Sequence, residues 1–250
     1  SDGARGATAV QSPTTTSPIA YEQYLRGRLR WSQRNAASLA AAQQHFEAAI
    51  AADPRFALAH TGLADCRSLA VLYASSLPRD SMPKARAAAE RALELDPQLA
   101  EAHTSLAYVQ FAFDQDFVLA ESGFARAIAL SPNYATAHQW QHELFAAQGR
   151  VTEQRAAIAR AHALDPLSPI LATEIGWGLY FAGEHAEAQR HLERTIIAAP
   201  TFPLAWVILG LAQLHVGDDE AACHSVGHAI KLSGDAPLPF AIRSEERRVG

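Results

Sequence analysis

The chain has 250 residues, 49% of them hydrophobic, and a formal net charge of -5 at pH 7. This mildly acidic composition carries no dense basic cluster in its central part, so we expect no nucleic-acid binding by this region. No apolar run approaches the roughly 18 residues that cross a bilayer, so we expect no membrane insertion either. Alanine, leucine, glutamate, arginine and glutamine are frequent, and together they favour α-helix over strand.

The first segment, residues 1–19, is rich in Ser, Thr, Gly, Ala and Pro and predicts a disordered linker. The chain begins at Ser1 without a methionine, so we interpret it as part of a longer protein. Its two cysteines, Cys66 and Cys223, lie far apart and do not indicate a disulfide framework. This favours a cytoplasmic location, and a periplasmic one stays open if a transmembrane helix precedes the region.

A helix-ending motif recurs along the chain, as in "LELDP" at 93–97 and "IALSP" at 128–132. Each motif closes with a proline or, once, a glycine, and the last four spacings are 35, 34, 34 and 34 residues. Because the residue before a proline avoids α geometry, each closing residue predicts the end of a helix. The closing residues are Pro54, Pro97, Pro132, Pro166, Pro200 and Gly234.

Aligned on these stops, the repeats share columns of small and of large residues. A larger apolar residue, such as Phe46 or Leu192, stands eight positions before most stops. Gly149, Gly183 and Gly217 lie 34 apart, where a first helix turns into a second. The period, the Ala-rich helix pair and the proline stop resemble the tetratricopeptide repeat (TPR). The resemblance implies an all-α fold, a right-handed α-solenoid of about six repeats at 20–54, 55–97, 98–132, 133–166, 167–200 and 201–234.

The second repeat is longer than the others, with nine extra residues around 73–83 ("YASSLPRDSMP"). We expect a longer first helix and then a loop, with Asp80 or Ser81 capping the next helix and Pro83 in its first turn. Long loops on a scaffold are often functional, but loop insertions are also tolerated without a role. Both interpretations of this insertion stay open.

The stretch "AHQWQHE" at 137–143 resembles part of a metal site, because His138 and His142 would share one helix face beside Glu143. This pattern defines an alternative function, a metal-dependent enzyme or zinc site that uses His138 and His142. However, the spacing implies no third ligand, and the order differs from the H-E-x-x-H pattern of zinc proteases. No phosphate loop or nucleophile elbow occurs elsewhere. We therefore predict no catalytic residues, no metal and no cofactor.

The repeat columns offer a structural role for these histidines. His138 stands in a column of bulky rings, so we interpret it as a spacer in the core of a helix pair. The other members of this column are His60, His103 and Trp206. His142 stands where other repeats have small residues, such as Gly176 and Gly210, which we expect at close helix contacts. Trp140 should then take up more of the burial in the fourth repeat.

The C-terminal end lacks an obvious capping element. We expect Val226, Ile230 and Leu232 of the last helix to be partly exposed and to support weak self-association. Residues 235–250 form a tail, and its end, "RSEERRVG" at 243–250, looks like a translated sequencing adapter rather than native sequence.

In the TPR family, the first helices line a concave face along which partner segments lie, and the resemblance implies the same here. The corresponding face changes from polar to aromatic and apolar along the array. The Lys and Asn residues that clamp a terminal carboxylate in some members are missing at the matching positions, which disfavours such a ligand. The predicted partner-binding groove consists of Thr61, Asp65, Thr104, Tyr108, Gln139, Glu143, Trp177, Tyr180, Phe181, Leu211 and Leu214.

A narrower resemblance rests on longer phrases, among them "MPKARAAAERALELDPQLAEAHTSLAYVQF" at 82–111 and "DPLSPILATEIGWGLYFAGEHAEA" at 165–188. They look like the C-terminal repeat region of large bacterial signalling and transcriptional regulators, whose effector domain lies upstream. We therefore predict a non-enzymatic interaction scaffold or sensor module of such a regulator. Its partner would be a protein or peptide segment, including one from its own upstream effector domain. The alternatives are the metal-dependent enzyme and a stand-alone assembly scaffold.

Overall fold

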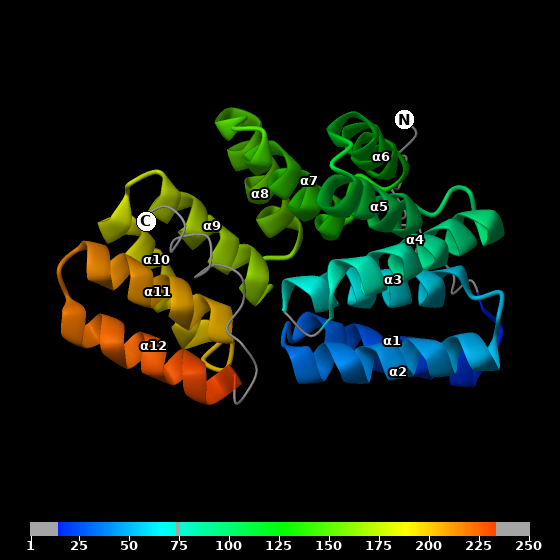
Figure 1. Cartoon of the computed structure of the whole chain (residues 1–250), viewed down its shortest axis with the longest axis horizontal. Coiled ribbons are helices and arrows are strands. Elements are labelled where there is room, and N and C mark those ends of the chain that lie inside the picture. Colours follow the sequence, from blue (N-terminus) through cyan, green and yellow to red (C-terminus); the bar gives the residue numbers. More distant parts are fainter. Residues whose placement is uncertain (1–14, 74–75, 234–250) are drawn as a thin grey trace, which may run out of the picture.

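The computed structural model describes residues 15–73 and 76–233, which form α-helices joined by short turns (Figure 1). The predictions for 1–14, for the tail after Gly234 and for its end at 243–250 lie outside these residues. The helices are α1 (Pro18–Ser32), α2 (Ala36–Ala52), α3 (Ala57–Leu72), α4 (Pro78–Leu95), α5 (Ala100–Val109), α6 (Phe117–Leu130), α7 (Ala135–Ala147), α8 (Val151–Leu164), α9 (Pro169–Phe181), α10 (His185–Ala198), α11 (Pro203–His215) and α12 (Asp219–Ser233), with a π-helical turn, η1 (Gln110–Asp114), after α5.

Consecutive helices pack as pairs, α1 with α2 through to α11 with α12, and the pairs follow one another along the array (Figure 1). First helices of neighbouring pairs also touch from α1 through α3 and α5 to α7, and again from α9 to α11, while α8 contacts α9 between these two stretches. One pair cannot bury its apolar stripe alone, whereas stacked pairs share a continuous core. The described residues therefore form an all-α solenoid, as the sequence predicts.

Large and small residues alternate within the core of each pair. Phe46 and Leu192, from the predicted column of large residues, are both 0% exposed. A Cβ placed on Gly176 would lie 2.6 Å from Leu192 Cγ, and one on Gly210 would lie 2.7 Å from Val226 Cγ2. Such distances leave no room for a methyl group in a close-packed interior. Both predicted close contacts are confirmed.

The turn inside a pair contains one residue in the left-handed conformation. Gly149, Gly183 and Gly217 have φ angles of 70°, 79° and 85°. Glycine adopts this conformation easily because it has no Cβ atom, and the predicted turns are confirmed. The equivalent turns of the first and third repeats contain Arg34 (φ 51°) and Gln115 (φ 57°). A side chain costs about 1 kcal/mol or more in this conformation.

The N-terminal helix begins earlier than the predicted linker allows. α1 starts at Pro18, and the side chain of Ser17 caps it by accepting a hydrogen bond from the backbone N–H of Ala20. Proline suits this first position because its fixed φ angle is helical and its missing N–H would have no partner there. The hydroxyl of Thr15 also donates to the carboxylate of Asp53, just after α2.

The long second repeat differs from its prediction at one point. α3 has 16 residues, against 13 in α7, α9 and α11, so the longer first helix is confirmed. α4 begins at Pro78, so the predicted cap at Asp80 or Ser81 is wrong and Pro83 lies inside the helix. Pro78 starts the helix for the same reason as Pro18. The Ser81 hydroxyl instead donates to the backbone carbonyl of Arg67, at 2.8 Å.

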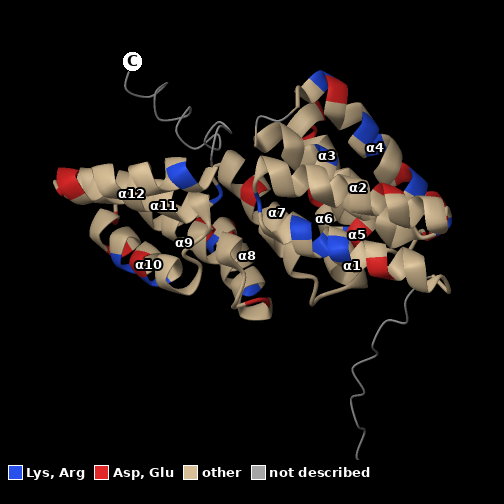
Figure 2. Cartoon of the chain, turned by 90° about the horizontal axis from the view of Figure 1, so that it is seen from below, with Lys and Arg blue, Asp and Glu red and all other residues tan. Residues whose placement is uncertain are grey.

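The surface of the array carries both signs of charge, and exposed apolar residues include some on the last helix. Figure 2 shows acidic and basic residues interspersed along the helices. On α12, Val226 and Leu232 are half-buried and Ile230 is 51% exposed, as predicted, while self-association stays a prediction. Among the described helices, none combines the length and the apolar character needed to span a bilayer.

Candidate functional site

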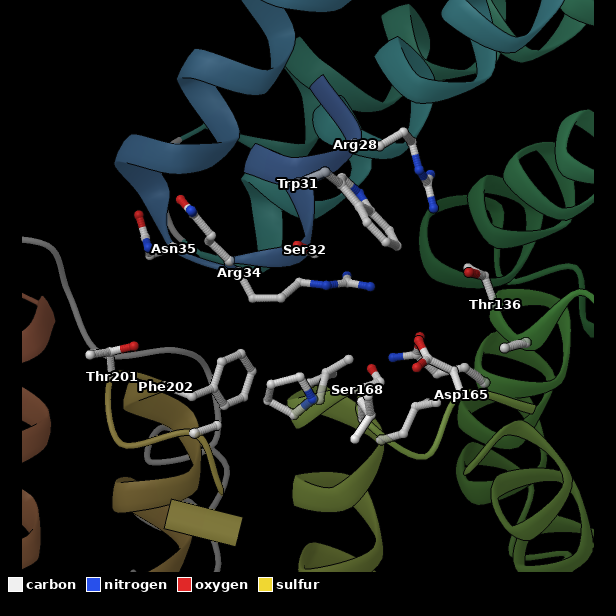
Figure 3. Close-up of a pocket in the computed structure, with 18 residues that line it drawn as sticks. Arg28, Trp31, Ser32, Arg34, Asn35, Thr136, Asp165, Ser168, Thr201 and Phe202 are labelled. Carbon is white, nitrogen blue, oxygen red and sulfur yellow. The ribbon is translucent and has the colours of Figure 1, made fainter. Parts of the chain in front are cut away.

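The array curves until its first turn faces the turns of its later repeats (Figure 3). Arg34 and Asn35, in the turn between α1 and α2, line one cavity together with Thr136 of α7, Ser168 before α9 and Phe202 before α11. We name this space the hairpin cavity, after the turn of the α1–α2 hairpin that lines it, and its volume is about 720 Å³. A solenoid adds a small rotation with each repeat, so segments that are far apart in sequence meet across its interior.

A second cavity of about 550 Å³ adjoins the first, and Arg34, Gln139 and Ile170 line both. Its volume is in the range of about 300–1,000 Å³ that is typical of ligand pockets. Trp177 and Phe181 stack with their ring centroids 5.7 Å apart, and Phe181 is 49% exposed. We name this space the aromatic cavity, because its apolar wall consists of Tyr73, Phe111, Trp177, Phe181, Leu69, Leu72, Ile170 and Leu204.

The structure separates the predicted groove residues into two sets. Four line the aromatic cavity: Gln139, Glu143, Trp177 and Phe181. Seven do not line it: Thr61, Asp65, Thr104, Tyr108, Tyr180, Leu211 and Leu214. Five of these seven are buried, whereas Leu211 is half-buried and Leu214 is 53% exposed. Partner binding stays a prediction for every residue of both sets.

Asp65 and Tyr108 belong to a filled part of the interior. The Asp65 carboxylate is 1% exposed, lies 3.4 Å from a guanidinium nitrogen of Arg28 and accepts a 2.6 Å hydrogen bond from the Ser105 hydroxyl. Burial raises the pKa of Asp65 to about 6, although Arg28 and the Ser105 hydrogen bond both lower it. The ring of Tyr108 packs on Trp140, with centroids 4.4 Å apart. These contacts make the first part of the predicted groove a packed core.

Arg34 brings a positive charge into the interior. Its side chain extends from the α1–α2 turn across the hairpin cavity (Figure 3) and is 4% exposed. The guanidinium carbon lies 3.7 Å from the centroid of the Trp31 ring, a cation–π contact. Its Nε atom is buried and has no hydrogen-bond partner among the described residues. The Trp31 ring therefore helps to hold a charge that other groups leave partly unsatisfied.

Two carboxylates, Glu143 on α7 and Glu174 on α9, line the aromatic cavity. Glu174 is 9% exposed, and its Oε1 atom accepts a 2.7 Å hydrogen bond from Gln139 Nε2. Its Oε2 atom is buried and has no partner within the described part of the chain. Glu143 is half-buried and lines the same cavity. The site thus holds one fully buried and one half-buried acid.

The surroundings favour the protonated form of both acids. Burial raises the pKa of Glu143 to about 7, although Arg34 and a hydrogen bond from Tyr108 lower it. Burial and, to a smaller extent, the charge of Glu143 raise the pKa of Glu174 well above its ordinary value. Each carboxylate therefore makes the ionisation of the other more costly, and a cation placed between them would reverse this.

The two histidines of the metal hypothesis make separate backbone contacts. His138 Nε2 lies 3.0 Å from the carbonyl oxygen of Pro132, and His142 Nδ1 lies 3.1 Å from that of Gln154. A carbonyl oxygen can only accept, so both of these ring nitrogens donate. Across residues 15–73 and 76–233, no three His, Cys, Asp or Glu side chains gather in a way that could hold a metal ion.

The column of rings has a different role from the one predicted. His138 is half-buried, and its ring ties α7 to the turn before it instead of filling the core of a helix pair. The prediction failed because a ring N–H six residues after a carbonyl can bond to it, which satisfies a backbone group near the end of the preceding helix. Equivalent bonds join His60, His103 and Trp206 to the carbonyls of Pro54, Pro97 and Pro200. Trp140 is 1% exposed, so its predicted burial is confirmed.

Sequence reasoning missed two residues of the interior, although the alignment of repeats contained a signal for each. Arg34 occupies the turn position that holds glycine in the last three repeats. Glu174 is the only charged member of its column, where the other repeats have Gly62, Ser105, Trp140 and Ile208. A charged residue in a column of uncharged ones indicates a local requirement, and both such residues face the interior cavities.

Comparisons with known proteins agree with this architecture. A model of the tetratricopeptide repeat family matches residues 173–232, and a search of curated protein sequences found no match. The chain is similar to TTC0263, a thermophilic TPR protein of Thermus thermophilus, with a TM-score of 0.61 and 18% identity over 78% of this chain and 99% of that one. It is similar to PilW, a type IV pilus biogenesis factor, with a TM-score of 0.57 and 20% identity over 86% of this chain and 90% of that one.

A chain of the APC/C hetero-tetramer Cut9–Hcn1 also has this fold, with a TM-score of 0.60 and 15% identity over 86% of this chain and 37% of that one. At such identities the similarity concerns the fold alone. The repeat period, the glycine turns, the paired helices and the family match point to one conclusion. The described residues have the fold of a tetratricopeptide repeat solenoid, and residues 173–232 match the model of that family.

Proposed function

We propose that this array is a non-enzymatic interaction module that binds an extended segment of a partner protein in its interior. Repeat arrays of this kind present long concave surfaces that suit protein partners. The single observation that supports the location is the aromatic cavity, a mostly apolar space that first helices of distant repeats line together. An apolar side chain of the partner segment would insert there.

Two aromatic residues are the proposed anchors. Trp177 is half-buried and Phe181 is 49% exposed, so each keeps ring surface available to a ligand. Aromatic residues in a largely enclosed pocket often dominate binding energy, at about 2 kcal/mol or more each. The polar groups Gln139 and Glu143 at the same wall would orient the backbone or the polar side chains of the segment.

The biological setting is also part of this proposal. The sequence phrases at 82–111 and 165–188 support a place in a bacterial signalling or transcription-regulating protein. In that setting the segment comes from a separate partner or from the upstream effector domain of the same protein. Titrating the array with the purified upstream region and with separate peptides would distinguish these two sources.

The test of this function uses peptides selected on the wild-type array from a displayed random library. Trp177→Ala should weaken the binding of a selected peptide by about 30-fold, because it removes one wall of the cavity. Phe113→Ala is the matched control, since Phe113 is 38% exposed and lies outside both cavities. A folded Trp177→Ala variant that binds as tightly as wild type would show that the aromatic cavity is not the binding site.

A further inference from the structure

When Glu143 and Glu174 are both ionised, the aromatic cavity has more negative than positive charge. Glu143, Glu174 and Arg34 are the charged side chains that line it, so full ionisation leaves one carboxylate in excess. His142 also lines the cavity, but burial lowers its pKa and it stays neutral near pH 7. Tyr73, which lines it too, has a pKa that burial raises further above neutrality. A single positive charge from outside would balance the site.

Arg34 does not already neutralise this excess. No ion pair within 4.0 Å joins Arg34 to Glu143 or Glu174 in the part of the chain that the structure describes. The Arg34 guanidinium lies over Trp31 instead, so it screens the two acids from the side of the hairpin cavity. Arg34 is the one Lys or Arg among the described residues that line the aromatic cavity, against two carboxylates.

One atom in particular indicates that the site is built for a ligand. Glu174 Oε2 is buried, lacks a hydrogen-bond partner among the described residues and belongs to a side chain that lines the cavity. A buried, unpartnered carboxylate oxygen is expensive, because folding removes its water and supplies nothing in return. Gln139 fixes this carboxylate through the other oxygen. Glu174 Oε2 therefore has a defined position and could accept a hydrogen bond from a donor on a ligand.

We infer that the Glu143–Glu174 pair is a recognition site for a basic side chain, arginine or lysine, on the segment that the aromatic cavity binds. This inference rests on the proposed function and adds the chemistry of the ligand to it. A guanidinium or ammonium group would donate to Glu174 Oε2 and Glu143 together, and charge-assisted bonds of this kind are the strong ones. The rings of Trp177 and Phe181 would cover its apolar stem and add a cation–π contact.

The chemistry of the pocket thus specifies a partner sequence with a basic residue close to an apolar one. A neutral polar residue would supply no positive charge to favour the ionised form of the two acids. An acidic residue would add a third carboxylate to two that already oppose each other's ionisation. The site would therefore reject acidic segments as well as accept basic ones, and rejection of this kind is an efficient source of specificity.

The experiment selects peptides from a displayed random library on the wild-type array and on the Glu143→Gln/Glu174→Gln variant. Glutamine keeps the shape of glutamate, so the variant should fold and keep the apolar cavity. Glu153→Gln/Glu187→Gln is the matched control, because it removes the same charge from surface ion pairs with Arg150 and Arg190. Affinities are then measured for the best wild-type peptide and for its version with the basic residue changed to glutamine.

We expect the wild-type and control arrays to enrich peptides that combine arginine or lysine with an apolar residue. Changing that basic residue to glutamine should weaken binding to both by about 30-fold or more, and binding should strengthen as the pH rises from 6 to 8. The same change should have little effect on the Glu143→Gln/Glu174→Gln variant, as a double-mutant cycle requires for direct partners.

Other results would overturn the inference in distinguishable ways. Selected peptides that depend on Trp177 but show no enrichment of basic residues would overturn the basic-ligand inference and leave the proposed function intact. Peptides that bind Trp177→Ala and wild type equally would overturn both. Failure to enrich any peptide on the wild-type array would likewise contradict both.

Discussion

The interior of the array has two halves, around Asp65 of α3 and around Glu174 of α9, and they differ in how completely a buried carboxylate is paired. In the first half, the carboxylate of Asp65 has Arg28 at 3.4 Å and the Ser105 hydroxyl at 2.6 Å. In the second half, one oxygen of Glu174 has no partner among the described residues, and the neighbouring acid is Glu143. The first helices thus contain a satisfied network in one half and, in the other, an acid pair in which one oxygen of Glu174 lacks a partner.

This difference teaches how a structural site can be told from a binding site within one repeat array. A buried ion pair that is completed by its own chain leaves nothing for a partner, and removing one member is destabilising because the other charge stays buried without a counter-charge. A buried carboxylate that its own chain leaves incomplete lowers stability, and a ligand can recover that loss. The comparison predicts that mutations in the two halves will have opposite effects on stability.

The largest effect should come from Asp65. Asp65→Ala would leave Arg28, which is only 28% exposed, without its carboxylate, and should cost about 3 kcal/mol of unfolding free energy. Asp65→Asn keeps the shape and can still accept from Ser105, so it should cost less. Urea denaturation of both variants measures these costs. An Asp65→Ala variant as stable as wild type would erase the contrast between the two halves.

The Glu143→Gln/Glu174→Gln variant should show the opposite behaviour, with a dependence on pH. The folded-state pKa values of both acids are raised, that of Glu143 from 4.5 to about 7. An acid whose pKa is higher in the folded state than in the unfolded state contributes its full stabilisation at a pH below the unfolded-state pKa. This stabilisation is lost as the pH rises through the folded-state pKa. The variant should therefore match wild type near pH 4 and be more stable by about 2 kcal/mol or more at pH 8.

Thermal unfolding of both proteins between pH 4 and 8 measures this difference directly. His142 has a lowered pKa and shifts stability in the opposite direction, but it is present in both proteins and cancels in the comparison. A variant that is less stable than wild type at pH 8 would show that the two carboxylates are satisfied in the folded state. The second half would then resemble the first.

The smallest effect on stability should come from alanine substitutions at two glycines of α9, which test whether the second half is closely packed around its cavity. Gly176 and Gly178 lie on the same helix, α9, but a Cβ on Gly176 would lie 2.6 Å from Leu192 Cγ, while one on Gly178 would meet nothing within 4 Å. Gly178→Ala should stabilise the protein through helix propensity, by up to about 1 kcal/mol. Gly176→Ala should instead destabilise it by about 1 kcal/mol, because Leu192 must move. Equal melting temperatures would indicate that the second half is loosely packed.

Local sequence patterns predicted most of the fold. The proline stops and the glycines of the turns indicated the helix pairs, because each acts within a few residues. Close contacts such as that of Gly176 could be predicted from one aligned column. The start of α4 was mispredicted because Asp80 and Ser81 are good capping residues. The helix instead begins at Pro78, since proline is favoured at the first position of a helix.

The candidate site was only partly predictable, because it depends on curvature. Glu143 on α7 and Trp177 and Phe181 on α9 were each identified from the pattern of their own helix, and they line the aromatic cavity. The position of Arg34 opposite α7 and α9 results from rotations that accumulate over several repeats, which no single repeat encodes. A comparison of columns would have singled out Arg34 as an exception, but not the cavities that it joins.

The most direct test of binding in the aromatic cavity is the indole N–H signal of Trp177 in a nitrogen-labelled array, followed by NMR during titration with a selected peptide. Trp177 lines the cavity, whereas Trp206 of α11 lines neither interior cavity and serves as the internal control. The account predicts a saturable shift of the Trp177 signal, with the Trp206 signal unchanged. A peptide that binds while the Trp177 signal stays in place would contradict it.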